Sequence, residues 1–173
     1  WTSGVYFSQE KIAGKSEITD SNFYPFDLSP LPLYEVNYDS TARNAAVFGE
    51  ATWQLTEQLS LLVGGRYSSE RQQGASSGFV LDFDTFLPQT FAGDRSVTSS
   101  RFTPKALMQY KLDRDTMAYA SVTTGFKSGG INFNPPVASY RPEKITSYEV
   151  GTKMVRGGGA LEFDAAAFYY DYT

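Results

Sequence analysis

The side chains that could carry acid–base chemistry in this chain are carboxylates, because the sequence contains no histidine and no cysteine. Hydrolysis of a glycosidic bond would require two acids that face each other across a cleft. Glu162 and Asp164 stand two positions apart in "LEFDAAAFYY", so on a strand they share one face. The commonest general base and the thiolate metal ligands are missing as well. The sequence therefore predicts no catalytic residue, no metal site, no cofactor and no enzyme.

Phosphate and nucleic-acid binding are also disfavoured. The glycine-containing segment "GGINFN" lacks the Lys-Ser/Thr pair of a phosphate-binding loop, and no helix is expected after it. A nucleic-acid binder needs a basic surface, whereas this chain has a formal net charge of −4. The chemistry that remains is non-covalent binding by aromatic and charged side chains.

Two sets of side chains are candidates for ligand contact. The segment "SNFYPFDLSPLPLYEVNY" is rich in aromatic residues and proline, which suits a loop that contacts a ligand, although packing against neighbouring loops explains it equally well. Arginines near the ends of expected long connections could attract an anionic ligand or remain solvated. The candidates are Phe23, Tyr24, Phe26, Tyr34, Arg95 and Arg141.

Strands of alternating character are expected to position these groups. In 45–55 one face carries Val47, Ala51 and Trp53, and the other face carries Glu50. The same pattern recurs in 1–10, 59–70, 102–112, 118–127, 143–153 and 161–170. The sequence predicts an all-β fold, an antiparallel up-and-down meander of about seven long strands. The polar faces carry Glu50, Arg66, Lys105, Lys127, Glu149 and Asp164, which could line a passage or pair with one another across strands.

The expected connections alternate between short and long. Tight turns are predicted at 56–58, 113–115 and 156–159, and long loops at 11–40, 71–97 and 128–142. The loop at 71–97 is predicted to contain a hairpin of its own. Because successive antiparallel strands reverse direction, all tight turns fall at one end of the sheet, which is the asymmetry of outer-membrane barrels.

Alternation alone leaves two architectures open, a soluble β-sandwich and a partial transmembrane β-barrel. Predicted strands of about 10 to 14 residues exceed those of ordinary soluble sheets. Trp53 and Tyr110 stand on the apolar face near tight turns, where a membrane barrel carries an aromatic girdle. These features favour the barrel. Packing of the face with Val47, Trp53, Leu61 and Met108 against a second sheet would contradict it.

Several linked segments resemble the barrels of TonB-dependent outer-membrane receptors. They are "AAVFGEATWQLTEQLSLLVGGRYSSE", "TPKALMQYKLDRDTMAYASVTTGFKSGGINFN", "PEKITSYEVGTK" and "LEFDAAAFYYDY", in this order. The resemblance implies that residues 1–173 are a mid-barrel fragment of one domain, about a third of a wall of roughly 22 strands.

The resemblance also implies a function. Such receptors import scarce nutrients, most often ferric siderophores, across the outer membrane of Gram-negative bacteria. The implied partners are outer-membrane lipid and lipopolysaccharide, a siderophore or similar small ligand, and the TonB complex through an N-terminal region outside this sequence. Two alternatives remain. One is a soluble β-sandwich binding module, such as a carbohydrate-binding domain, and the other is a different porin or small closed barrel.

Overall fold

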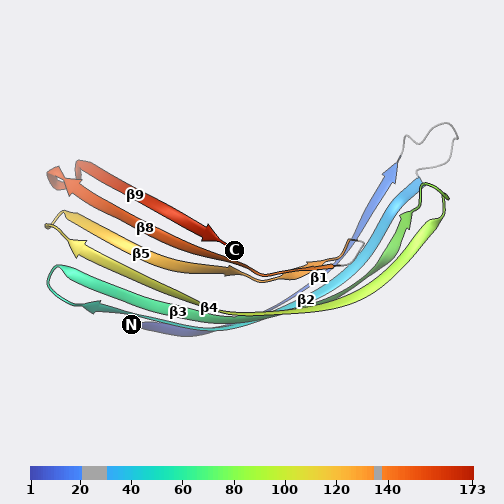
Figure 1. Ribbon diagram of the computed structural model, residues 1–173, viewed down its shortest axis with the longest axis horizontal. Coiled ribbons are helices and arrows are strands. Elements are labelled where there is room, and N and C mark those ends of the chain that lie inside the picture. The colour runs from blue at the N-terminus through green and yellow to red at the C-terminus, as the bar shows by residue number, and fades with distance from the viewer. Residues whose placement is uncertain (21–30, 135–137) are drawn as a thin grey trace.

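The protein is one curved antiparallel sheet with a small hairpin on it (Figure 1). The computed structural model describes residues 1–20, 31–134 and 138–173. Its seven-stranded sheet has the order β1-β2-β3-β4-β5-β8-β9, and β6 pairs with β7 in a second, two-stranded sheet. The strands are β1 (Thr2–Asp20), β2 (Leu31–Gln54), β3 (Leu59–Leu81), β4 (Pro88–Lys111), β5 (Thr116–Lys127), β6 (Gly130–Asn132), β7 (Ala138–Tyr140), β8 (Glu143–Arg156) and β9 (Leu161–Tyr172).

The predicted meander is confirmed. Strands that follow one another in the chain are neighbours in the sheet, and the β6–β7 hairpin is inserted between β5 and β8. The register places Trp53 opposite Leu61, Leu61 opposite Met108 and Met108 opposite Ala120, so apolar positions of successive strands share one face. Within the described part of the chain, no helix combines the length and the apolar character needed to cross a membrane.

We name the two faces by their residues. The outer face carries Trp53, Leu61, Met108 and Val150, and the inner face carries Glu50, Lys105 and Glu149. The outer side chains are uncovered: Val47 is 54% exposed, Met108 48% and Val150 57%. The second sheet of the described chain, the β6–β7 hairpin, packs on the inner face. The outer face is therefore not one half of a sandwich core.

The predicted loops at 11–40 and 71–97 are wrong in extent. β1 continues to Asp20, β2 begins at Leu31, β3 continues to Leu81 and β4 begins at Pro88. The connection between β3 and β4 is only 82–87, so the hairpin predicted inside 71–97 consists of the ends of these two strands. The connection between β1 and β2 at 21–30 lies outside the described residues.

In the long strands, the apolar side chains change from the outer face to the inner face about half-way along. Near the tight turns the outer face of β2 is apolar, with Trp53, Ala51 and Val47. Beyond Ala45 the outer positions become polar, and the apolar side chains Tyr38, Val36 and Tyr34 stand on the inner face. Val36 is completely buried. We call the segments of β1–β4 on the two sides of this inversion the turn half and the far half.

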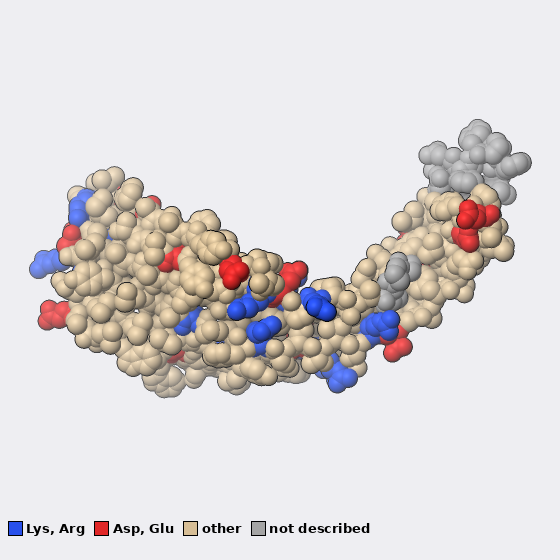
Figure 2. All heavy atoms as spheres, in the orientation of Figure 1, with Lys and Arg blue, Asp and Glu red and all other residues tan. Residues whose placement is uncertain are grey.

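The inversion explains why sequence periodicity missed the far half. The regular alternation of apolar and polar residues that indicates a strand is interrupted where its phase changes. The polar residues that follow therefore resemble a loop. The curved right-hand arm of Figure 1 consists of this far half of β1–β4, while β5, β8 and β9 remain beside the turn half. In Figure 2, many charged side chains gather around the middle of the molecule and at its tips.

The hairpin β6–β7 covers the inner face of the far half. The backbone N–H of Gly129 donates to Oγ of Ser99 at 3.1 Å, and that of Ile131 donates to Oε1 of Gln72 at 3.2 Å. The ring of Phe133 stacks on Tyr38 with centroids 5.5 Å apart. Ile131 of the hairpin is buried, and the other buried apolar side chains of the described chain, Val36, Ala46 and Leu81, lie in β2 and β3, so the core is small.

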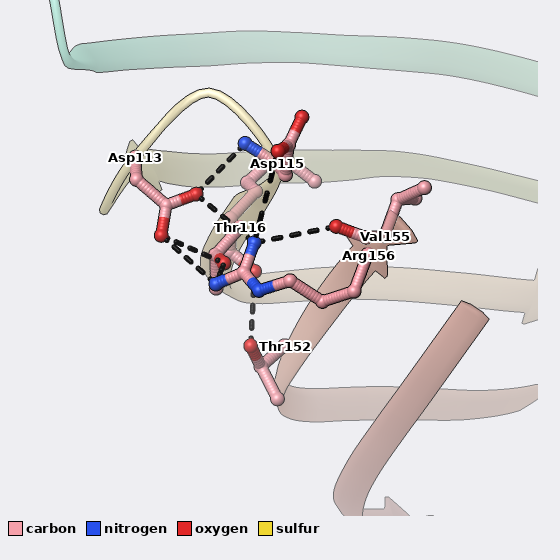
Figure 3. A network of polar contacts seen from close by, with 7 residues as sticks. Asp113, Asp115, Thr116, Thr152, Val155 and Arg156 are labelled. Carbon is pink, nitrogen blue, oxygen red and sulfur yellow. Dashed lines mark hydrogen bonds and ion pairs between the residues drawn. The ribbon is translucent and has the colours of Figure 1, made fainter. Parts of the chain in front are cut away.

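A side-chain network joins two of the tight turns (Figure 3). The guanidinium of Arg156 at the end of β8 donates to Oδ2 of Asp113 at 3.0 Å and to Oγ1 of Thr116 at 2.8 Å. It also pairs with Asp115 at 3.9 Å. The backbone N–H of Val155 donates to the carbonyl oxygen of Asp115 at 2.8 Å. The β4–β5 turn is therefore fixed to β8 by both side-chain and backbone contacts.

We expect this network to weaken in acid. Hydrogen bonds from the Arg156 guanidinium and then from the Asp115 backbone hold the pKa of the Asp113 carboxyl below its ordinary value of 3.8. A group with a lowered folded-state pKa stabilises above its unfolded pKa, and this contribution is lost as the pH falls through the folded pKa. Amide exchange at 112–116 should accelerate in Arg156→Gln at neutral pH, and this difference from the parent protein should vanish in strong acid.

Arg114→Gln is the matched control, because Arg114 lies in the same turn and makes no ion pair with any described residue. It should leave exchange at 112–116 unchanged. Equal acceleration in the two variants would show that loss of a positive charge, not loss of the network, is responsible.

Candidate functional site

The charged side chains of the inner face pair with one another in the turn half. Lys105 of β4 forms an ion pair with Glu50 of β2, although β3 lies between these strands. Gly64 of β3 stands opposite both residues. A methyl carbon at Gly64 would lie 2.8 Å from Cβ of Glu50 and 3.0 Å from Cε of Lys105. The glycine thus leaves the space in which the two charges meet.

Other predicted inner-face residues have partners on adjacent strands. Oε1 of Glu149 accepts a hydrogen bond from the hydroxyl of Tyr119 at 2.5 Å. Lys127 pairs with Glu143 at 3.5 Å, and Asp164 pairs with Lys153 at 3.9 Å. These contacts agree with cross-strand pairing on a wet surface, where each exposed ion pair contributes little to stability.

Arg66 is held differently, by aromatic rings. Its guanidinium lies 5.3 Å from the ring centroid of Tyr6 and 6.0 Å from that of Phe48. Its Nε donates to Oγ of Ser68 at 2.8 Å. No carboxylate within the described ranges lies at ion-pair distance from Arg66. Cation–π contacts therefore position a positive charge on the inner face without neutralising it.

Arg66 lies at the edge of a cavity of about 530 Å³ at the junction of the turn half and the far half. Asn44 and Glu70 form part of its wall, with Nδ2 of Asn44 donating to Oε2 of Glu70 at 3.0 Å. Oδ1 of Asn44 is buried and has no hydrogen-bond partner among the described residues. The lining combines acidic, basic and amide groups and includes Glu10, Arg66, Glu70, Gln72, Lys127 and Tyr140. This cavity can hold a polar ligand by several hydrogen bonds.

Two of the six predicted ligand-contact residues lie in strands, so the prediction that they belong to loops is wrong. Tyr34 is in β2, and its hydroxyl donates to Oδ1 of Asn134 at 2.6 Å. Arg95 is in β4, opposite Gly74 on the inner face. Arg141 is exposed in the connection between β7 and β8. Phe23, Tyr24 and Phe26 lie outside the described residues.

Sequence reasoning missed the residues that hold the hairpin. Gln72 and Phe133 fall in the predicted loops at 71–97 and 128–142, and Ser99 falls between the loop at 71–97 and the strand predicted at 102–112. One signal was available: Ile131 and Phe133 alternate with polar residues directly after the Gly129–Gly130 pair, a short strand pattern. Their partners on β2, β3 and β4 are far away in sequence and could not be inferred from it.

We expect Phe133→Ala to release the hairpin. The substitution removes the stack on Tyr38, and an aromatic pair of this kind contributes about 1 kcal/mol beyond its buried area. Limited proteolysis of the folded protein should then cleave 128–142 faster. Phe83→Ala is the control, since Phe83 is 58% exposed in the β3–β4 connection and has no aromatic partner in the described chain. Cleavage at an unchanged rate in Phe133→Ala would show that the backbone contacts alone hold the hairpin.

Comparison with known proteins places this arrangement in a family. Residues 2–173 match the family described as TonB dependent receptor-like, beta-barrel. The chain is 26% identical over 152 residues to the pesticin receptor of Yersinia pestis, covering 86% of this chain and 21% of that protein. The pesticin receptor of Yersinia enterocolitica serotype O:8 matches at the same identity and coverage. The chain thus spans about a fifth of the length of these relatives.

Two solved structures share the fold. The ferric yersiniabactin uptake receptor FyuA from Yersinia pestis superposes with a TM-score of 0.72 at 21% identity, covering 99% of this chain and 26% of that chain. The ferric-catecholate import receptor Fiu from E. coli K12 gives a TM-score of 0.74 at 17% identity, covering 98% of this chain and 28% of that chain. With the match across residues 2–173, the conclusion is that this chain belongs to the TonB-dependent receptor-like β-barrel family.

Proposed function

We propose that this chain is a wall segment of a receptor that imports a scarce nutrient across the outer membrane of a Gram-negative bacterium. The proposed cargo is a ferric siderophore, and the energy for import would come from the TonB complex through residues outside this stretch. The family assignment and the receptor names of the relatives support import rather than enzymatic turnover.

The observation that carries the membrane assignment is the inversion of the strand alternation. In β3 the apolar outer positions run from Leu59 to Tyr67, nine residues in all, and the outer position Arg71 lies beyond them. A tilted membrane strand crosses an apolar band about 25 Å tall in about 9 to 11 residues. Beyond such a band the outer face meets water, so polar outer positions in the far half are expected.

The inner face would then line the lumen. We propose that Glu50, Arg66, Lys105, Lys127, Glu149 and Asp164 form a hydrated wall against which the rest of the receptor packs. The ligand-contact candidates Phe23, Tyr24, Phe26, Tyr34, Arg95 and Arg141 belong in this proposal to the end far from the tight turns. A ferric-catecholate and a ferric yersiniabactin receptor among the structural matches support an iron–siderophore cargo.

The test is uptake of radioactive iron by the complete receptor, expressed in a Gram-negative strain that lacks its own siderophore receptors. A panel of catecholate, hydroxamate and phenolate ferric siderophores should contain at least one that is imported in a TonB-dependent manner. Import of iron by none of them, with the receptor present in the outer membrane, would contradict the siderophore cargo. Absence of the protein from the outer-membrane fraction would contradict the membrane assignment itself.

A further inference from the structure

An uncompensated basic patch lies on the outer face at the inversion. One sheet row contains Gln9, Arg43, Arg71 and Thr98, and the next row contains Lys11, Thr41, Gln73 and Ser96. Arg43 and Arg71 are directly opposite each other on β2 and β3. We call Arg43, Arg71 and Lys11 the boundary patch. All three side chains are exposed.

No acidic side chain of the described residues neutralises the positive charges of the boundary patch. Like charges directly opposite each other destabilise a strand pair. No carboxylate in the described parts of the chain lies within ion-pair distance of the patch. Arg43 makes a polar contact with a neutral group, since its Nε donates to Oε1 of Gln9 at 3.1 Å. Glu10 and Glu70, its sequence neighbours, belong to the inner face and line the cavity there.

A lysine farther along the outer face of the far half behaves differently. Lys15 stands on the same outer face, four positions beyond Lys11, and pairs with Glu17 at 3.0 Å and Glu35 at 3.2 Å. These pairs raise the pKa of the Lys15 ammonium, first through the hydrogen bond to Glu17. Lys15 is thus neutralised by acidic residues of the chain, whereas the three cations at the inversion are not.

The patch stands directly beside the apolar band. The outer positions that precede it are Phe7, Val47, Tyr67 and Phe102, which are 48–71% exposed. If lipid covers these side chains, as the proposed function requires, the boundary patch stands at the height of the lipid headgroups. Groups at that height in an outer leaflet carry phosphate, and arginine binds phosphate through paired N–H donors.

We propose that Arg43, Arg71 and Lys11 form a docking surface for the phosphate groups of the outer-leaflet glycolipid, lipopolysaccharide. The lipid supplies the negative charge that relieves the repulsion between the opposed arginines. The aromatic and aliphatic side chains below the patch contact its acyl chains. This inference rests on the proposed membrane placement and identifies one lipid partner and the three residues that bind it.

The test uses the complete receptor in lipid bicelles and measures the affinity for bisphosphorylated lipid A. Each basic residue near an anionic membrane surface contributes about 1 kcal/mol, so Arg43→Gln/Arg71→Gln should weaken binding about thirtyfold. The parent protein should bind dephosphorylated lipid A as weakly as the double variant does. Raising the salt concentration should reduce the difference between the parent and the double variant.

Arg114→Gln at a tight turn is the control, because it removes an exposed positive charge at the other end of the sheet, and it should bind lipid A like the parent. Equal affinity of parent and double variant would overturn the proposal, as would competition by millimolar inorganic phosphate, which would indicate a site for free anions. A double variant that inserts and imports normally but shows no change in lipid A affinity refutes this inference alone. Failure of the parent to insert into bilayers refutes the proposed function instead.

Discussion

Met108→Arg should destabilise the complete receptor in lipid vesicles by about 2 to 4 kcal/mol. Met108 stands on the outer face near the middle of the apolar stretch of β4, between Tyr110 and Phe102, and is 48% exposed. A guanidinium at this depth loses its hydration without gaining a partner, and substitutions to arginine at the bilayer midplane cost this amount. Equilibrium unfolding of the receptor in vesicles measures the change.

Leu107→Arg is the matched control, one residue away on the inner face. It adds the same side chain to a surface that already carries Lys105 and Glu149, so we expect a change of at most about 1 kcal/mol. A protein core on the outer side would make Met108→Arg equally damaging in detergent-free buffer. The lipid assignment predicts instead that the effect depends on the bilayer and becomes smaller in thinner membranes or near the headgroups.

The turn half was predictable from sequence because one physical rule governs it throughout. Between Ala45 and Glu70, and again from Phe102 through β5 to Lys127, the outer face is almost free of charge. The tight turns at 56–58 and 113–115 then fix the register of each hairpin. Alternation and turn position together determine which residues share a face.

The far half and the hairpin could not be predicted in the same way. The alternation in the far half has the opposite phase, and the hairpin packs on its inner face. The contact of Ile131 with Gln72 joins residues 59 apart in the sequence. The pair of Glu50 and Lys105 spans an intervening strand and requires the register of two hairpins at once. Such contacts follow from the assembled sheet and leave no local pattern.

Gly78→Ala should disrupt the far half and cost about 3 kcal/mol, in the upper range for an overpacked site. Gly78 of β3 stands opposite Val36 of β2. An added methyl group would lie well inside contact distance of the carbonyl oxygen of Glu35 and 3.1 Å from Cα of Val36. Backbone atoms cannot turn aside as the end of a flexible side chain can, so β2 and β3 must separate there.

The two strands should separate only in the far half, and this local effect tests whether the far half unfolds independently of the turn half. Hydrogen exchange should accelerate at 33–40 and 74–80 and, because Phe133 loses its platform on Tyr38, at 129–134. Exchange in the turn half and membrane insertion should stay as in the parent, since the apolar band is untouched.

Gly49→Ala is the control: its added methyl would meet nothing closer than 3.7 Å, so neither half should change. Accelerated exchange along the whole of β3 in Gly78→Ala would mean that both halves unfold as one unit. The inversion would then separate two environments along the same strands, but it would not separate two units that unfold independently.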